Sequence, residues 1–275
     1  MLEVRAFFRH LEGFRFKALF EGVKYPWEAV ARIGDFVRHF LQGLPKNLSQ
    51  DVSFFPGVAS HQIRMPTGHG IEKLLVVQSY IQETEDIYLE ELDIYLGRNT
   101  VIEPGVVIKS PALIGEESQV RQGAYLRGNV IIGDHCVVGH TTEVKNSVFL
   151  NGAEAGHFAY VGDSILGNHV NLGAGTKLAN LRFRTVEEKE GGELKPISIP
   201  VGEHALSTGL VKLGAVLGDH VELGCNAVTS PGTLIGYNSW VYPNTTVKKG
   251  YYPPGIILRH KEREVEALPM RSPTS

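Results

Sequence analysis

Residues 96–155 read LGRNTV IEPGVV IKSPAL IGEESQ VRQGAY LRGNVI IGDHCV VGHTTE VKNSVF LNGAEA, ten consecutive blocks of six residues. Each block opens with an aliphatic residue, and its fifth position is mostly small or β-branched. The opening residues are Leu96, Ile102, Ile108, Ile114, Val120, Leu126, Ile132, Val138, Val144 and Leu150. A second run with the same spacing begins at Leu217 and continues to Val247.

A repeat of six residues excludes the two common amphipathic patterns. A helix requires apolar spacings of three and four, and a half-buried strand alternates over only four to eight residues. The period fits a parallel β-helix built from hexapeptides, in which three hexads make one triangular coil. Stacked coils bury an axial column of aliphatic side chains that no single coil buries alone. We therefore predict a mainly β chain, a left-handed parallel β-helix of hexapeptide repeats.

The composition excludes several classes of protein. The 275 residues are 43% hydrophobic and 21% charged, as in globular proteins. A net charge of -3 argues against a nucleic-acid binder. The sequence has neither an apolar run long enough to span a membrane nor the cleavage site of a signal peptide. The two cysteines, Cys136 and Cys225, support neither a disulfide framework nor a zinc ribbon. We expect a cytoplasmic protein without a metal site.

The repeat is interrupted after Leu150. The next inward candidates follow at spacings of five or six residues, namely Ala155, Val161, Leu166, Leu172 and Leu178. Residues 182–198, RFRTVEEKEGGELKPIS, are charged and contain glycine, which predicts a loop inserted into the solenoid. Loops carried by a rigid scaffold are frequent functional sites.

The pattern predicts three regions. Residues 1–90 form a partly helical N-terminal cap, residues 91–255 the β-helix, and residues 256–275 a tail. Within the cap, Pro26 begins an amphipathic helix that ends near Gly43, with Trp27, Val30, Ala31, Val37, Phe40 and Leu41 on one face. Residues 45–70 are predicted to be a loop, and residues 71–92 are compatible with helix or strand. We expect the cap to cover the open end of the solenoid, which otherwise exposes its core and unpaired strand edges.

Residues 155–181, AGHFAYVGDSILGNHVNLGAGTKLANL, carry more than the repeat. They resemble the C-terminal acetyltransferase domain of the bifunctional enzymes that make UDP-N-acetylglucosamine, with its signature A-G-H-x-x-Y-x-G-D…G-x-x-V-N-x-G-A-G-T…N. The phrases ANLRF at 179–183 and STGLVKLGAVLG at 207–218 are more similar to the archaeal sugar-1-phosphate nucleotidylyltransferase/acetyltransferases. The resemblance covers about residues 96–255. No G-x-G-T-R type nucleotide loop precedes the repeat, so nucleotidyl transfer is not expected.

The resemblance implies a catalytic histidine at His157. Attack by an amine on a thioester requires a base, and histidine suits this because its unperturbed pKa is near 6.5. Glu143 matches the family's glutamate and is expected to orient His157. Arg127 and Lys145 match the phosphate-binding cations; a guanidinium offers phosphate a bidentate fork, and a lysine acts as a point charge.

The remaining site residues also follow from the resemblance. Tyr160 and Asn171 match sugar-contacting positions, and Asn180 matches an asparagine beside the reacting amine. Backbone amides around Ala174 are expected to hold the oxyanion or the pantetheine arm. A loop lysine that reaches the substrate from a neighbouring subunit is Lys189 or, second, Lys195. Ser207 matches a serine that contacts coenzyme A.

These residues predict an acetyl-CoA-dependent N-acetyltransferase of an amino-sugar phosphate, most simply glucosamine 1-phosphate. Similarity to the hexapeptide acyltransferases also implies a homotrimer with active sites between solenoids. The alternatives are an acyl-carrier-protein-dependent O-acyltransferase and a solenoid scaffold without catalysis. A zinc-dependent carbonic anhydrase on the same fold is disfavoured. His135 and His140 have the spacing of two of its ligands, but the position of the third is Ala112, and catalytic zinc takes three protein ligands.

Overall fold

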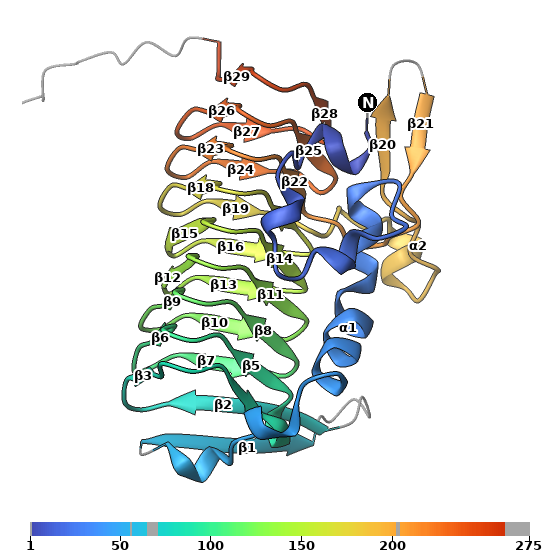
Figure 1. Cartoon of the computed structure of the whole chain (residues 1–275). Coiled ribbons are helices and arrows are strands. Elements are labelled where there is room, and N and C mark those ends of the chain that lie inside the picture. The colour runs from blue at the N-terminus through green and yellow to red at the C-terminus, as the bar shows by residue number, and fades with distance from the viewer. Residues whose placement is uncertain (1, 56, 65–70, 202–203, 262–275) are drawn as a thin grey trace, which may run out of the picture.

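The computed structural model describes residues 2–55, 57–64, 71–201 and 204–261. Figure 1 shows a solenoid of stacked coils with a helix lying along one flank. The strands form three nine-stranded sheets, here named A, B and C, and a separate two-stranded hairpin. Strands on successive coils pair in parallel, so the predicted mainly β fold of stacked hexapeptide coils is confirmed.

From β5 to β27 each coil contributes one strand to every sheet. Sheet A contains β4 (Ile87–Leu89), β5 (Ile94–Leu96), β8 (Ala112–Ile114), β11 (Val130–Ile132), β14 (Ser147–Phe149), β17 (Ile165–Leu166), β22 (Ala215–Leu217), β25 (Thr233–Ile235) and β28 (Gly250–Tyr252). Sheet B contains β1 (Val58–Arg64), β2 (Ile71–Val77), β7 (Val107–Lys109), β10 (Tyr125–Arg127), β13 (Glu143–Lys145), β16 (Tyr160–Gly162), β19 (Lys177–Leu178), β24 (Val228–Thr229) and β27 (Thr246–Val247). Sheet C contains β3 (Ile81–Gln82), β6 (Val101–Ile102), β9 (Gln119–Val120), β12 (Val137–His140), β15 (Glu154–His157), β18 (Asn171–Leu172), β23 (Glu222–Leu223), β26 (Trp240–Val241) and β29 (Ile257–Leu258).

The axial core consists of the residues that the hexad pattern predicts, with one exception. Residues from Leu96 to Val144 at intervals of six belong to one buried cluster, as do Ala155, Val161, Leu166, Leu172 and Leu178. The prediction for Leu150 is wrong, because Phe149 occupies the axis and Leu150 packs outside the coil. The register therefore slips between Val144 and Phe149, where the turn from sheet B to sheet A is one residue shorter.

A second hydrophobic core covers the outer face of sheet A. Its solenoid side is a column of mid-strand residues, namely Tyr95, Leu113, Ile131, Val148, Ile165, Val216 and Leu234. The N-terminal segment, defined here as residues 2–44, packs on this column with five phenylalanines that are at most 7% exposed: Phe7, Phe8, Phe14, Phe16 and Phe20. The segment includes 3-10 helices Val4–Ala6, Leu11–Gly13 and Lys17–Phe20. The N-terminal segment therefore covers a flank of the solenoid.

Helix α1 (Pro26–Gln42) begins and ends as the sequence predicts. Pro26 occupies its first turn, and Glu28 accepts hydrogen bonds from the preceding main chain. The helix packs on β11, β14 and β17. It buries Ala29 and Ile33 with the predicted Trp27, Val30, Val37 and Leu41, whereas Ala31 is exposed and Phe40 half-buried.

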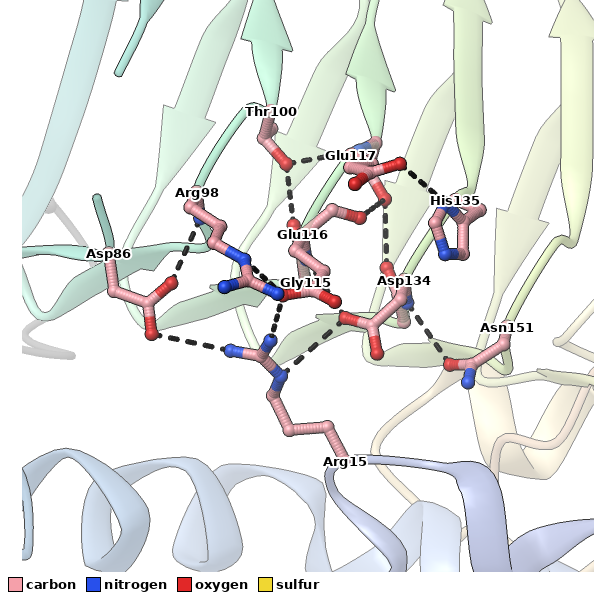
Figure 2. Close-up of polar contacts among 12 residues, drawn as sticks. Arg15, Asp86, Arg98, Thr100, Gly115, Glu116, Glu117, Asp134, His135 and Asn151 are labelled. Carbon is pink, nitrogen blue, oxygen red and sulfur yellow. Dashed lines mark hydrogen bonds and ion pairs between the residues drawn. The ribbon is translucent and has the colours of Figure 1, made fainter. Parts of the chain in front are cut away.

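A polar network fixes the N-terminal segment to the corner between sheets A and C (Figure 2). The Arg15 guanidinium lies 2.8 Å from Glu116, 3.4 Å from Asp86 and 3.5 Å from Asp134. Glu116 and Asp134 lie on successive coils, and the coil that carries Arg98 lies between Asp86 and Glu116. Higher on the same corner, Asp219 accepts a hydrogen bond from the Arg9 N–H at 2.7 Å. The segment is thus held by charge at one edge and by apolar packing across sheet A.

The first strands close one end of the solenoid. β1 pairs antiparallel with β2, and β2 pairs antiparallel with β7 of the first full coils. The sequence predicted a loop for residues 45–70, so β1 is a strand that the pattern missed. This part also contains 3-10 helices Lys46–Leu48, Val52–Phe54 and Glu90–Leu92.

The other end of the chain continues the solenoid further than expected. β29 pairs with β26 beyond the predicted boundary at residue 255. Residues 262–275 of the predicted tail lie outside the described residues. None of the helices in the described ranges is long and apolar enough to cross a membrane.

The inserted loop leaves the solenoid after β19 and returns before β22. It contains α2 (Val186–Lys189) and the hairpin of β20 (Ser198–Val201) and β21 (His204–Ser207). The buried Glu188 pairs with Arg182 and accepts the Lys195 N–H at 3.0 Å, which ties the loop into a compact unit. Ile197 and Ile199 pack into the second core, so the hairpin lies on the sheet A side.

Candidate functional site

His157 lies at the corner where sheet C turns into sheet B. It ends β15, and its side chain is exposed. The ring lies beside Phe158, with centroids 6.5 Å apart, and Phe158 makes the turn with a left-handed φ of 35°. Within the described residues the imidazole has no hydrogen-bond or ion-pair partner, so both ring nitrogens are accessible to a bound molecule.

The corner residues of successive coils stack into a column. The Phe158 N–H donates to the His140 carbonyl, the Gly175 N–H to the His157 carbonyl, and the Asn226 N–H to the Ala174 carbonyl. Ala174 therefore lies one coil beyond His157 and half-buried. Its own N–H donates no hydrogen bond inside the described part of the chain, so it is a donor available beside the imidazole.

The outer surface of sheet B carries the charged residues. Tyr125, Glu143, Tyr160 and Lys177 are register partners on successive coils, close to the corner of His157. Arg127 is the last residue of β10 and Lys145 the last residue of β13, so both lie at the ends of these strands farther from the corner of His157. With about 4.8 Å between strands, Arg127 lies roughly 10 Å along the axis from the Tyr160 coil.

Glu143 binds Arg127 in the structure. Arg127 Nη1 donates to Glu143 Oε1 at 2.6 Å, and this hydrogen bond raises the pKa of the guanidinium above its usual value. No contact between Glu143 and His157 is found among the described residues. Glu143 was expected to orient His157, but among the described residues no hydrogen bond joins the two side chains.

Tyr160 and Asn180 form a pair on the surface of sheet B. The Tyr160 hydroxyl donates to Asn180 Oδ1 at 3.3 Å, and Asn180 Nδ2 donates to Asp163 Oδ2 at 2.5 Å. Both side chains lie over Gly162, since a Cβ there would be 2.6 Å from the Tyr160 hydroxyl and 2.7 Å from Asn180 Nδ2. The glycine on β16 thus makes the room in which the pair meets.

Four predicted residues lie elsewhere on the protomer. Asn171 is exposed on sheet C, where it pairs in register with Glu154. Lys189 ends α2 on the inserted loop and is exposed, with Lys195 further along the same loop. Ser207 lies in the hairpin on the sheet A side. In a triangular solenoid that face is opposite the corner of His157, so one protomer does not bring Ser207 to His157.

Sequence reasoning missed several residues that contact or neighbour this group. Asp163 accepts hydrogen bonds from the side-chain amides of Asn146 and Asn180, and Lys109 and Tyr125 lie beside Arg127 on sheet B. Lys109 Nζ and the Arg127 guanidinium carbon lie 5.7 Å and 5.9 Å from the centre of the Tyr125 ring. Asp163 is the D of the signature A-G-H-x-x-Y-x-G-D, but the resemblance gave it no role. For Asn146 the signal was the break in the hexad register, which falls at the turns that contain Asn146 and Asp163.

The group offers acid–base chemistry and anion binding. It combines an exposed imidazole, a free main-chain N–H, two cations and an amide with a fixed orientation. Among the described residues, no set of three or more His, Cys, Asp or Glu side chains is placed to hold a metal ion.

Comparison with known proteins identifies relatives over the same part of the chain. The family model described as GMPPB C-terminal domain matches residues 108–257. A bifunctional sugar-1-phosphate nucleotidylyltransferase/acetyltransferase of Sulfurisphaera tokodaii is 35% identical over 54% of this chain and 39% of its own length. A bifunctional protein GlmU of Methanococcus aeolicus is 30% identical over 61% of this chain and 41% of its own. In both, the match spans about two fifths of the relative.

A third relative is closer in size. A putative uncharacterized acetyltransferase, YaiX, of Escherichia coli K12 is 30% identical over 64% of this chain and 74% of its own length. The match to the family model, over residues 108–257, includes the corner of His157.

Proposed function

Because the chain belongs to the family described as the GMPPB C-terminal domain, and relatives that share this solenoid are named acetyltransferases, we propose that it transfers an acetyl group from acetyl-CoA to the amine of an amino-sugar phosphate. Glucosamine 1-phosphate is the proposed acceptor. The observation that carries the proposal is the exposed His157, whose ring has no hydrogen-bond partner in the described part of the chain and lies across one corner from the Tyr160–Asn180 pair.

The proposed reaction needs a base and an oxyanion donor. The amine nitrogen attacks the thioester carbonyl carbon, a C–N bond forms, and His157 accepts the proton that the nitrogen loses. The oxyanion of the tetrahedral intermediate accepts a hydrogen bond from the Ala174 N–H, one coil away. The C–S bond then breaks, and the imidazolium returns the proton to the departing coenzyme A thiolate.

The phosphate of the acceptor would lie across sheet B. Arg127 and Lys145 supply two positive charges there, and the remaining donors of the Arg127 fork suit a phosphate oxygen pair. Because these cations lie on the coils before His157, acetyl-CoA would approach along the coils after it, past Ala174. Lys189 and Ser207 remain proposed contacts, with the acceptor and with coenzyme A respectively.

We propose that the complete site forms between copies in a homotrimer. Asn171 faces outward from sheet C and Tyr160 from sheet B, so a site that uses both needs two chains. The inserted loop also presents Phe183, fully exposed, with Leu181 and Val186 exposed beside it. Light scattering on the purified chain tests this: we expect roughly 90 kDa for three chains of 30.2 kDa, and a monomer would contradict a shared site.

The activity is tested by thiol release from acetyl-CoA across a panel of amino-sugar phosphates and nucleotide-linked amino sugars. Release that depends on glucosamine 1-phosphate supports the proposal. Release with longer acyl donors on a carrier protein favours the O-acyltransferase. No release with any acceptor leaves the scaffold interpretation, and the catalytic proposal then fails.

A further inference from the structure

Asp163 is a carboxylate at the centre of the candidate site that has no assigned role. It is only 5% exposed and lies at the turn between β16 and β17. Two side-chain amides donate to it: Asn146 Nδ2 to Oδ1 at 2.8 Å, and Asn180 Nδ2 to Oδ2 at 2.5 Å. The Asp163 carbonyl accepts the Gly214 N–H at 2.8 Å, where the inserted loop returns to the solenoid.

The turn that carries Asp163 is built for this contact. The inward residues Val144 and Phe149, and then Val161 and Leu166, are five residues apart instead of six. Asn146 and Asp163 occupy the equivalent positions of these two shortened turns, with left-handed φ values of 45° and 47°. Asn and Asp are the non-glycine residues that adopt this conformation most readily. The shortened turns thus stack the Asn146 amide against the Asp163 carboxylate.

The carboxylate fixes the orientation of the Asn180 amide. An ionised carboxylate only accepts hydrogen bonds, so the Asn180 NH₂ group must face Asp163 and its Oδ1 must face away. On that side the Tyr160 hydroxyl donates to Oδ1. Burial, with the charges of Glu143 and Asp163, raises the pKa of Tyr160, which keeps its proton in place as the donor. One lone pair of Asn180 Oδ1 then remains for a bound molecule.

We propose that Asp163 is a positioning residue for substrate specificity, which turns the Asn180 carbonyl oxygen toward the acceptor so that the site selects an amine over a hydroxyl. This inference rests on the proposed function. An ammonium group offers only donors, which match a carbonyl oxygen, whereas a hydroxyl pairs with either a donor or an acceptor. The ammonium loses one proton to solvent and becomes the amine that attacks; the same hydrogen bond then holds one N–H while His157 takes the proton that the nitrogen loses as the C–N bond forms.

Replacing Asp163 by asparagine reverses the amide. In Asp163→Asn, an Asn146 amide that keeps its orientation donates Nδ2–H to the new side chain, so the NH₂ group of the new side chain faces Asn180. Asn180 must then present Oδ1 to position 163 and NH₂ to the acceptor. The Asn180 NH₂ group, a donor, now faces the ammonium, which is also a donor, so the two do not pair. A sugar hydroxyl can accept a hydrogen bond from that NH₂ group. We expect the preference for amine over hydroxyl to fall by about 10-fold or more, the usual effect of an unpaired group at a binding site.

The experiment measures binding separately from turnover. Calorimetry on the full chain gives Kd for glucosamine 1-phosphate and for glucose 1-phosphate, and the thiol assay gives kcat and the KM for acetyl-CoA. We expect Asp163→Asn to lose its preference between the two sugar phosphates and to lower kcat, with the acetyl-CoA KM unchanged. An unchanged preference, even with a lower melting temperature, makes Asp163 merely structural and overturns the inference.

A swapped pair provides the rescue. In the double variant Asp163→Asn, Asn180→Asp, the asparagine accepts from Asn146 and donates to the new carboxylate. The other carboxylate oxygen then faces Tyr160 and the acceptor. We expect the preference for the amine to return, and a double variant without it contradicts the proposal even if Asp163→Asn fails to fold.

A matched control is Asp219→Asn. Asp219 is 1% exposed and accepts Asn168 Nδ2 at 3.0 Å, but it lies at the corner between sheets A and C. We expect it to lower the melting temperature without altering the sugar preference. Wild-type protein that prefers glucosamine 1-phosphate but transfers no acetyl group contradicts the proposed function alone, and wild-type protein that binds both equally contradicts this inference.

Discussion

At the scale of the residue, the candidate site depends on the absence of a side chain at Gly162. Gly162 is the register partner of Lys145, yet it carries no side chain. The space is taken by the Tyr160 hydroxyl and the Asn180 amide. His157 is the opposite case, an exposed side chain for which the described residues provide neither a hydrogen bond nor an ion pair. Residues with few structural partners are those whose replacement separates activity from stability.

We predict that His157→Ala lowers turnover at least about 100-fold, the usual share of a general base, while the melting temperature stays unchanged. The imidazole is exposed and contributes no hydrogen bond to the fold. Steady-state thiol release and thermal unfolding measure the two quantities. The matched control is His140→Ala, the same corner one coil earlier, whose Nδ1 lies 2.9 Å from the Gln122 carbonyl. Equal turnover in the two variants would show that His157 is not the base.

We predict that Arg127→Ala raises the KM for the sugar phosphate about 10-fold or more and leaves the KM for acetyl-CoA unchanged. The reason is the loss of a charge-assisted hydrogen bond to the phosphate. Initial rates against each substrate in turn separate the effects. Arg121→Ala is the control. The Arg121 guanidinium donates hydrogen bonds to the Gln119 side chain, and Arg121 directly follows β9 of sheet C. A parallel rise in both KM values counts against phosphate binding by Arg127.

At the scale of the element, the N-terminal segment determines which surface of the solenoid is free. Its phenylalanines and α1 cover the apolar outer column of sheet A, so that face is not available to another molecule. Sheets B and C and the corner between them stay exposed. At the corner between sheets A and C, Arg15 also binds the segment to the carboxylates of Asp86, Glu116 and Asp134 (Figure 2).

The Arg15 network predicts a dependence of stability on pH. Partial burial opposes ionisation of Asp86, but hydrogen bonds from Tyr95 and the Arg98 N–H, with the charge of Arg15, leave its pKa below the usual value. A lowered folded-state pKa stabilises the protein above the unfolded pKa near 3.9, and this is lost as pH falls through the folded value. We therefore predict that Arg15→Met lowers the melting temperature by a few degrees at pH 7, and that its difference from wild type narrows below about pH 4.

The control for this prediction is Arg38→Met. Arg38 pairs with Asp35 on the exposed side of α1, and exposed pairs contribute little. We expect its melting temperature to match wild type at both pH values. If the difference in melting temperature between Arg15→Met and wild type stays constant from pH 7 to pH 3, Arg15 does not stabilise the protein through ionised carboxylates.

At the scale of the whole molecule, stability comes from the stacking of coils. Each coil buries its apolar residues only against the coils before and after it, so a defect in one coil is transmitted to its neighbours. Glycines on sheet C show how close the coils come. A Cβ on Gly139 would lie 1.7 Å from the Gly156 carbonyl oxygen, whereas a Cβ on Gly156 would have no atom within 4 Å.

We predict that Gly139→Ala lowers the melting temperature by several degrees or prevents folding, because the neighbouring main chain has to move. Gly156→Ala, on the next coil of the same sheet, should leave the melting temperature near that of wild type. Thermal unfolding by circular dichroism measures both. Equal losses would mean that the spacing of coils on sheet C is not set by contact.

The fold was predictable to a large extent because a period of six residues recurs locally. The axial residues follow from it, and the one error, Leu150, arose where a turn lost a residue. The site was less predictable. The resemblance assigned roles to His157, Tyr160 and Asn180 but none to Asp163 and Asn146, because the contacts of these two depend on the coil above or below.

The amino-acid sequence by itself determined the stacked hexapeptide coils, α1 and the inserted loop, because each follows from spacings between residues near one another in the chain. Only the tertiary structure decided that Glu143 binds Arg127, that Ser207 lies on the face opposite His157, and that the N-terminal segment covers sheet A. Coil stacking brings together residues 16 to 20 positions apart, and the N-terminal segment meets partners more than 70 positions away. A local sequence pattern does not specify which of these distant residues come into contact.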